Sequence, residues 1–240
     1  MSGKVKASGE FKAFSESLKH NLDIIALFLA LMMSYLDNIG TDENKFRELY
    51  ENQLREYDED VRVWLRMDKL EILARWIFEV SITRSVEAFD YYLSQILLKV
   101  FTKRPDIFRA SEYKAEVREF LEAGSVPEFM KRYAEKKVNE LSYMGLPKII
   151  EYLNNRLGLG FDTKTSSFQA ACEIVEVRNI LVHNAGHVNK LFLQRTGRTD
   201  LVEGDLYPLT LDYLKDRFKE LTKTAGNLDV VITSHFKLNQ

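Results

Sequence analysis

Hydrophobic residues recur along this chain at the three- and four-residue spacing of amphipathic α-helices, and no convincing alternation of period two is found. The longest pattern runs from Asp68 to Phe101, where Lys103-Arg104-Pro105 ends it. Its apolar stripe contains Leu70, Leu73, Ile77, Val80, Ile82, Val86, Phe89, Leu93, Ile96 and Val100. We therefore predict an all-α fold in which residues 68–101 form one very long helix.

Shorter helices are predicted on both sides of this element, several of them beginning at a residue suited to capping a helix. The expected elements are a frayed tail over 1–9 and helices over 11–36, 41–57, 111–121, 125–143, 147–156 and 209–236. Trp64 and Trp76 have apolar neighbours and are expected in the core. We divide the chain into an N-terminal helical extension, residues 1–62, and a helical domain, residues 63–240.

The most apolar stretch, Ile24–Leu36, is too short to span a bilayer, which takes roughly 20 residues. A signal peptide is not expected, because no small-x-small cleavage site follows and Asp37-Asn38-Ile39-Gly40 stops a helix. We expect this helix to be buried, in the core or at a subunit contact, and the protein to be cytoplasmic with no membrane association. The single cysteine, Cys172, suits a reducing compartment and excludes an intrachain disulfide or a zinc site of several cysteines.

The charge of the chain narrows the ways in which it could meet nucleic acid. A formal net charge of −2 gives no global attraction to nucleic acid or anionic lipid, so such a contact requires a local basic patch. Lys190, Arg195 and Arg198, in an expected loop, form one candidate RNA-binding patch, the alternative being an ordinary solvated surface. Lys131-Arg132 and Lys136-Lys137 share their helix with glutamates, and we interpret them as a mixed solvated face.

The densest group of chemically useful side chains lies in Glu176–Gly186, with the sequence EVRNILVHNAG. It ends a helical pattern that Asp162–Ser167 can cap, and Asn184-Ala185-Gly186 favours a left-handed helix end. On a straight helix Arg178 and His183 would lie about 140° apart. Both can touch one phosphate only if the helix ends or bends near the histidine, or if each meets its counterpart from a second chain.

These side chains suit cleavage of RNA without a metal ion. His183 can take or give a proton at a ribose 2′-hydroxyl or a leaving oxygen, because histidine titrates near neutrality. The Arg178 fork matches two phosphate oxygens, and Asn179 can hold the imidazole or donate to the phosphate. Glu176 can orient His183 or Arg178. The alternative is structural: Arg178 would pair with a buried acid, and His183 would sit at the favourable C-terminal end of the helix dipole.

Residues 178–189, RNILVHNAGHVN, resemble the signature of HEPN domains (higher eukaryotes and prokaryotes nucleotide-binding). The shared pattern is an arginine, a polar residue, a few apolar residues and a histidine, and the later Asn-x-Gly-x-Val-Asn is similar to the ribonuclease LS-like subset. A long early helix, a motif late in a helix and a terminal amphipathic helix agree, so the resemblance covers about residues 65–240. It implies a HEPN-like helical bundle, to which residues 1–62 are an addition.

HEPN domains usually form dimers whose two motifs face each other across a shared cleft. Many are metal-independent endoribonucleases, including toxins of toxin–antitoxin pairs and phage-defence effectors. The resemblance implies an RNA substrate, an antitoxin protein as a further partner and no cofactor, with Arg178 and His183 catalytic and Asn179 supporting. Because other members keep the fold and only bind, the alternative is a non-catalytic helical module that binds RNA, a nucleotide or a protein partner.

Two positions beside the motif limit its chemistry further. His187 follows His183 by four residues, but Gly186 interrupts the helix and no third ligand is near, so we predict no metal site. Ala185 stands where one subgroup of the family has the tyrosine of a His-x-Tyr sequence, which is a modification site there. Regulation through that position is therefore not expected in this chain.

Overall fold

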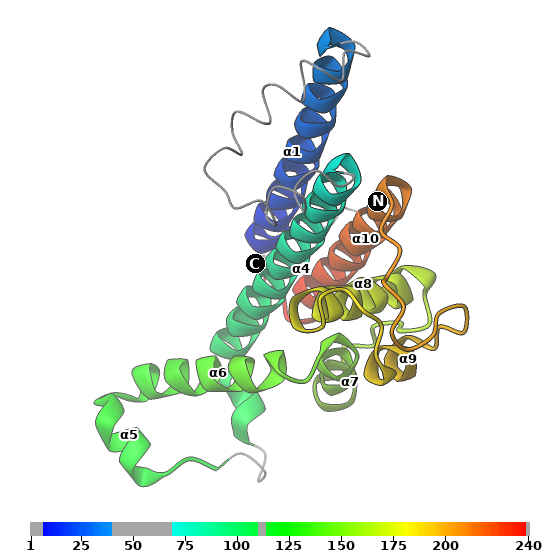
Figure 1. The fold of residues 1–240 in the computed structure, drawn as a ribbon. Helices are drawn as coiled ribbons and strands as arrows, with labels where there is room; N and C mark the ends of the chain where they lie inside the picture. Colours follow the sequence, from blue (N-terminus) through cyan, green and yellow to red (C-terminus); the bar gives the residue numbers. More distant parts are fainter. Residues whose placement is uncertain (1–6, 40–68, 110–113, 239–240) are drawn as a thin grey trace, which may run out of the picture.

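The computed structural model describes residues 7–39, 69–109 and 114–238, which form a bundle of α-helices (Figure 1). The elements are α1 (Gly9–Ile39), α4 (Lys69–Lys103), the 3-10 helix η1 (Pro105–Arg109), α5 (Val117–Ala123), α6 (Val126–Ser142), α7 (Leu146–Leu157), α8 (Ser166–His183), α9 (Lys190–Thr196) and α10 (Leu211–His235). Across these described ranges the only β-type pairing is an isolated bridge between His187 and Leu206. The predicted all-α fold is confirmed.

Helix α4 is the central element, because α1, α6, α8 and α10 all pack against it. Figure 1 shows α1 and α10 running alongside α4, while α6 and α8 lie across it. The face of α4 that meets them is completely buried at Ile82, Val86, Phe89 and Ile96. Burying each such side chain contributes about 1.5–3 kcal/mol. The predicted helix over 68–101 is therefore confirmed. Its apolar stripe forms the centre of the core from Ile82 to Val100, whereas Val80, expected in the same stripe, is 39% exposed.

Helix α1 belongs to the same core as α4 and α10. The Phe14 ring on α1 lies 5.8 Å from the Phe89 ring on α4. Ahead of α1, the Ser8 backbone N–H donates to Asp229 Oδ2 at 2.8 Å, and the Ser8 hydroxyl donates to Asp229 Oδ1. Asp229 is buried on α10, so these bonds satisfy a carboxylate that would otherwise be costly to bury. The predicted helix over 41–57 and the predicted domain boundary lie outside the described residues.

Capping residues begin three of the helices at the places that the sequence indicates. The side chains of Ser125, Thr165 and Thr210 each accept a hydrogen bond from the backbone N–H three residues further on, at 3.3, 3.3 and 3.1 Å. Each bond satisfies one of the four N–H groups that a helix leaves unpaired at its start. The predicted starts of α6, α8 and α10 are thus confirmed to within a few residues.

Two predictions about the shorter elements are wrong. The helix expected to begin at Ser111 starts only after Glu116, because Glu116 forms a reciprocal capping box at that point. Residues 190–196, expected as a loop, form the helix α9. The side chain of Asn189 caps this helix, and Gly197 ends it in the left-handed conformation. The predicted basic patch therefore lies on and just after a helix.

Predictions of burial also need correction. Trp76, expected in the core, is 59% exposed, whereas Trp64 lies outside the described residues. On α1, Ile25 is buried, but Ile24 and Leu27 are 50% and 62% exposed because only one face of this helix meets α4 and α10. A subunit contact at Ile24 and Leu27 stays a prediction. Within the described part of the chain, no helix is long and apolar enough to cross a membrane.

Candidate functional site

The motif lies at the C-terminal end of α8, and the helix ends where the sequence predicts. The backbone N–H groups of Asn184 and Gly186 both donate to the carbonyl of Ile180, at 2.9 and 3.0 Å. Ala185 and Gly186 have φ angles of 49° and 80°, which is the left-handed region. This turn reverses the chain immediately after His183, so the histidine side chain stands at the rim of the helix end and not along its flank.

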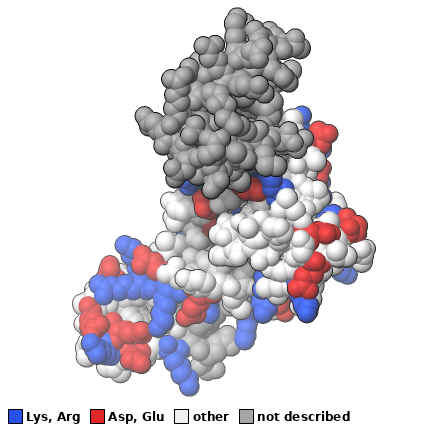
Figure 2. Space-filling view, viewed as in Figure 1, with Lys and Arg blue, Asp and Glu red and all other residues white. Residues whose placement is uncertain are grey.

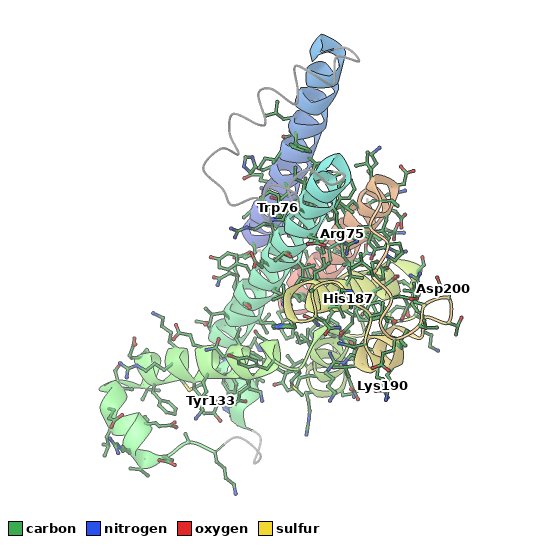
Figure 3. The ribbon with its side chains drawn as sticks, viewed as in Figure 1. Arg75, Trp76, Tyr133, His187, Lys190 and Asp200 are labelled. Atoms are coloured by element: carbon green, nitrogen blue, oxygen red, sulfur yellow. The ribbon has the colours of Figure 1, made fainter. Side chains whose placement is uncertain are left out.

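A second contact fixes the turn against α4. The Gly186 carbonyl accepts a hydrogen bond from the Tyr207 N–H at 2.9 Å, and the Tyr207 carbonyl accepts one from Arg75 Nη1 at 3.0 Å. Arg75 is on the side of α4 that faces α8 and α10 (Figure 3). A Cβ atom at Gly186 would lie 2.8 Å from Arg75 Nη2, so a larger residue there would displace the Arg75 guanidinium as well as strain the left-handed backbone. Sequence reasoning did not identify Arg75, because nothing in its local pattern distinguishes it.

Arg178 points from α8 to α4, where its Nη2 lies 2.6 Å from Asp90 Oδ2. The two side chains are 22% and 46% exposed, so this ion pair sits at the surface edge of the core. Burial raises the pKa of the Asp90 carboxyl above its ordinary value, and the charge of Arg178 opposes this rise only in part. The Nε of Arg178 is buried and has no hydrogen-bond partner among the described residues. Asp90 was not predicted; its only signal is an acid between Phe89 and Tyr91 in an apolar run.

His183 is the last residue of α8 and is exposed. Within the described residues its ring has no hydrogen bond, and neither a hydrogen bond nor an ion pair joins it to Arg178. Its imidazole is therefore open to a ligand from solvent. Both Arg178 and His183 reach the surface, but on different sides of α8: Arg178 is directed toward α4, whereas His183 is exposed at the helix end. This agrees with their separation of about 140° on an ideal helix.

Glu176 organises the flank of α8 that faces α9. Asn179 Nδ2 donates to Glu176 Oε2 at 3.3 Å, and Arg195 Nη1 lies 3.1 and 3.2 Å from the two carboxylate oxygens. Glu176 is only 14% exposed on its side chain, whereas Arg195 is 51% exposed. Glu176 thus holds Asn179 and Arg195. Among the described residues it contacts neither His183 nor Arg178, the two side chains that it was expected to orient. The cation that pairs with Glu176 is thus Arg195 of α9, which packs on α8.

The three cations of the predicted RNA-binding patch differ in how far they are engaged. Arg198 pairs with Glu173 and with Asp200, at 2.6 Å in each case, and these acids raise the pKa of its guanidinium. Arg195 is held by Glu176, and Lys190 is 80% exposed with its Nζ 4.0 Å from Glu203. Lys190 and the exposed part of the Arg195 guanidinium could bind a phosphate without breaking a close ion pair. Arg198 would first have to break its ion pairs with Glu173 and Asp200.

A partly buried acid, Glu173, underlies this patch. Glu173 accepts a hydrogen bond from the Tyr207 hydroxyl at 2.8 Å, and Arg217 Nη1 lies 3.5 Å away. Burial raises the pKa of Tyr207 to about 12, and Glu173 adds to the rise. The network joins α8, the 198–207 segment and α10, so Arg198 serves the packing of the motif helix.

His187 and Cys172 are two further side chains near the motif that carry potentially reactive groups. His187 Nδ1 lies 3.4 Å from the carbonyl of Asn184, and no cluster of three or more potential metal-ligating side chains exists among the described residues. Burial, with a contribution from Glu176, raises the pKa of Cys172 to about 12. The thiol therefore stays protonated and is a poor nucleophile at neutral pH.

Comparison with protein-family models, with curated proteins and with solved structures gives no match to this chain. The resemblance to HEPN domains therefore stays a prediction based on residues 178–189 and on the helical pattern around them.

Proposed function

We propose that the protein is a HEPN-type endoribonuclease that cleaves RNA without a metal ion and acts as a homodimer. The observation that supports this most directly is the placement of the motif: the helix ends immediately after His183, which leaves an exposed imidazole at that end and a partly exposed Arg178 earlier in the last turns of the same helix. An RNA phosphate can approach such an end from solvent. A role in a toxin–antitoxin or phage-defence system, with an antitoxin as partner, is part of the same proposal.

The reaction that these groups allow is a transesterification. One imidazole removes the proton of a ribose 2′-hydroxyl, the 2′-oxygen bonds to the adjacent phosphorus, and the bond from phosphorus to the 5′-oxygen breaks. The leaving 5′-oxygen takes a proton, and the products are a 2′,3′-cyclic phosphate and a 5′-hydroxyl. Arg178 would stabilise the charge that develops on the phosphate. It would then exchange its bond to Asp90 for one to the phosphate, while Asn179 supports the site.

Dimerisation would supply the second proton-transfer group. Each chain carries a single His183 in its motif, whereas the reaction needs both a base and an acid. A groove of about 400 Å³ beside the motif is lined by the apolar side chains of Trp76, Val80, Leu181 and Val182 and by four polar or charged side chains of α4, Glu79, Thr83, Arg84 and Glu87. Trp76 and Val182 are 59% and 51% exposed, an unusual position for large apolar residues. Contact of two copies across this groove would bring both motifs to one cleft.

The test is incubation of the purified protein with total RNA in EDTA. We expect cleavage with 2′,3′-cyclic phosphate ends, and loss of at least about a hundredfold in rate for His183→Ala. Arg178→Lys should also fail, because a point charge cannot replace the bidentate fork, whereas Asn179→Ala should be milder. His20→Ala, an exposed histidine on α1, is the matched control and should cleave normally. Wild-type cleavage by folded His183→Ala, or strict dependence on a divalent ion, would overturn the mechanism.

The second candidate is a non-catalytic module that binds RNA, a nucleotide or a protein partner. The Arg178–Asp90 pair weighs against catalysis and agrees with the structural alternative for Arg178, because a carboxylate already occupies one end of the guanidinium. Failure of the wild-type protein to cleave any RNA, together with binding that depends on Arg178, would favour this candidate. A monomer of 28.0 kDa in light scattering, with or without RNA, would count against the shared cleft.

A further inference from the structure

A second concave site lies on α6 and α7, on elements that contribute nothing to the motif. The cavity has a volume of about 450 Å³ and is lined by Lys114, Tyr133, Lys136, Lys137, Tyr152 and Arg156, with Glu140 beside them. Figure 3 shows Tyr133 on α6, well separated from His187 at the end of α8. The volume lies within the range of about 300–1,000 Å³ that is usual for small-ligand sites.

The walls of this cavity carry an excess of positive charge. Four lining residues are cationic and one, Glu140, is acidic, although the whole chain has a net charge of −2. Two of the cations already contact carboxylates: Lys137 lies 3.2 Å from Glu140, and Lys136 lies 3.0 Å from Glu119 outside the cavity. Such exposed pairs contribute little to stability and exchange readily for a phosphate. Figure 2 shows blue and red side chains interleaved over the α5–α6 end of the molecule.

The floor and the rim of the cavity differ in chemistry. Tyr133, Lys137 and Tyr152 are half-buried, whereas Lys114 and Lys136 are exposed at the rim. The Nζ of Lys137 lies 5.4 Å from the centre of the Tyr152 ring, so a cation and an aromatic face occur together. A phosphate needs exposed cations, and a nucleobase needs an aromatic face on which to stack. A nucleotide carries both a phosphate and a base.

We propose that this cavity binds one nucleotide unit of single-stranded RNA, with a phosphate at Lys114 and Lys136 and a base against Tyr152. A strand fits better than a free nucleotide, because the cationic rim is exposed and lets the backbone continue on both sides. Cleavage at His183 is not required, so the inference can fail or hold independently of the proposed ribonuclease activity. If both hold, the cavity anchors RNA at a distance from the cleaved bond.

The test uses a fluorescent 2′-O-methyl octauridylate, which has no free 2′-hydroxyl and therefore cannot be cleaved by the proposed reaction. Binding is measured by anisotropy over a range of salt concentrations. For the double variant Lys114→Ala and Lys136→Ala we expect affinity to fall about tenfold and the salt slope to fall by about 0.7, because one phosphate contact is lost. The matched double variant Lys131→Ala and Lys148→Ala removes two exposed lysines of α6 and α7 outside the cavity, and should bind as the wild type does.

A variant of the aromatic floor tests the stacking contact separately. Tyr152→Leu should weaken binding about tenfold without changing the salt slope, whereas Tyr152→Phe keeps the ring and should bind normally. Circular dichroism of both variants checks that they fold. Equal binding by the Lys114/Lys136 variant and its control, or absence of binding by the wild-type protein, overturns the proposal. Competition by uridine 5′-monophosphate at the same concentration as the oligonucleotide would assign the cavity to free nucleotides instead and refute the strand.

Discussion

Replacing Gly186 by alanine tests whether the turn after the motif is held by the contact with Arg75. Gly186 has a φ of 80°, and Gly197, which ends α9, has a φ of 67°. A Cβ atom at Gly197 would meet nothing within 4 Å, whereas one at Gly186 would lie 2.8 Å from Arg75 Nη2. Gly197→Ala is therefore a matched control, because it carries the backbone strain without the crowding.

The expected losses of unfolding free energy follow from the backbone strain and from the crowding at Arg75. An alanine in the left-handed region costs about 1–2 kcal/mol at either position. At Gly186 the guanidinium of Arg75 must also move, although it donates to the Tyr207 carbonyl at 3.0 Å and pairs with Glu79 at 2.9 Å. Loss of one charged hydrogen bond costs about 1.5–3 kcal/mol. We expect a decrease in the free energy of unfolding of about 1.5 kcal/mol for Gly197→Ala and about 3–4 kcal/mol for Gly186→Ala.

Urea denaturation followed by circular dichroism measures both values. A double-mutant cycle with Arg75→Ala isolates the effect of crowding. Without the Arg75 guanidinium, Gly186→Ala should lower the free energy of unfolding by no more than Gly197→Ala does, because only the backbone strain remains. In a thermal scan each kcal/mol corresponds to about 2–4 °C for a chain of this size. Equal losses for the two glycine variants in the presence of Arg75 would refute the reasoning, since the contact would then contribute nothing.

Three further predictions concern individual ionisable groups. The pKa of Asp90 is raised, so its stabilising effect is complete below the ordinary value of 3.8 and is lost as pH rises through the raised value. At pH 7 the Asp90→Asn variant should therefore keep the free energy of unfolding of the wild type within about 0.5 kcal/mol in urea titrations, although it loses the pair with Arg178. Burial raises the pKa of Glu10, but hydrogen bonds and the charge of Lys99 outweigh burial and give a lowered pKa. The stabilising contribution of Glu10 is therefore present above pH 4.5 and is lost as pH falls. Glu10→Gln should lower the free energy of unfolding by about 0.5–1 kcal/mol at pH 7 and leave it unchanged at pH 2, and equal stability at pH 7 would contradict this. The Cys172 thiol, with its pKa raised to about 12, should react with iodoacetamide at pH 8 roughly a thousandfold more slowly in the folded chain than in urea, and comparable rates would contradict this prediction.

The sequence by itself determined most of the helices and the end of the motif helix. Apolar spacing indicated the long helix over 68–101, and the run Asp162–Ser167 indicated where the motif helix begins. The run Asn184-Ala185-Gly186 indicated the left-handed turn. These features depend on neighbours within about four residues, through helix periodicity, capping and backbone freedom, so a single sequence contains the necessary information.

Only the tertiary structure decided what each face of these helices meets. Asp90 lies 88 positions before Arg178 in the chain, and no local pattern links the two. Trp76 was expected in the core but is exposed, because the packing of α4 leaves that side of the helix uncovered. The basic segment became helix α9, whose Arg195 turns to Glu176. Periodicity determines which residues share a face; the partner of that face depends on how distant segments pack together, which the spacing of one segment does not encode.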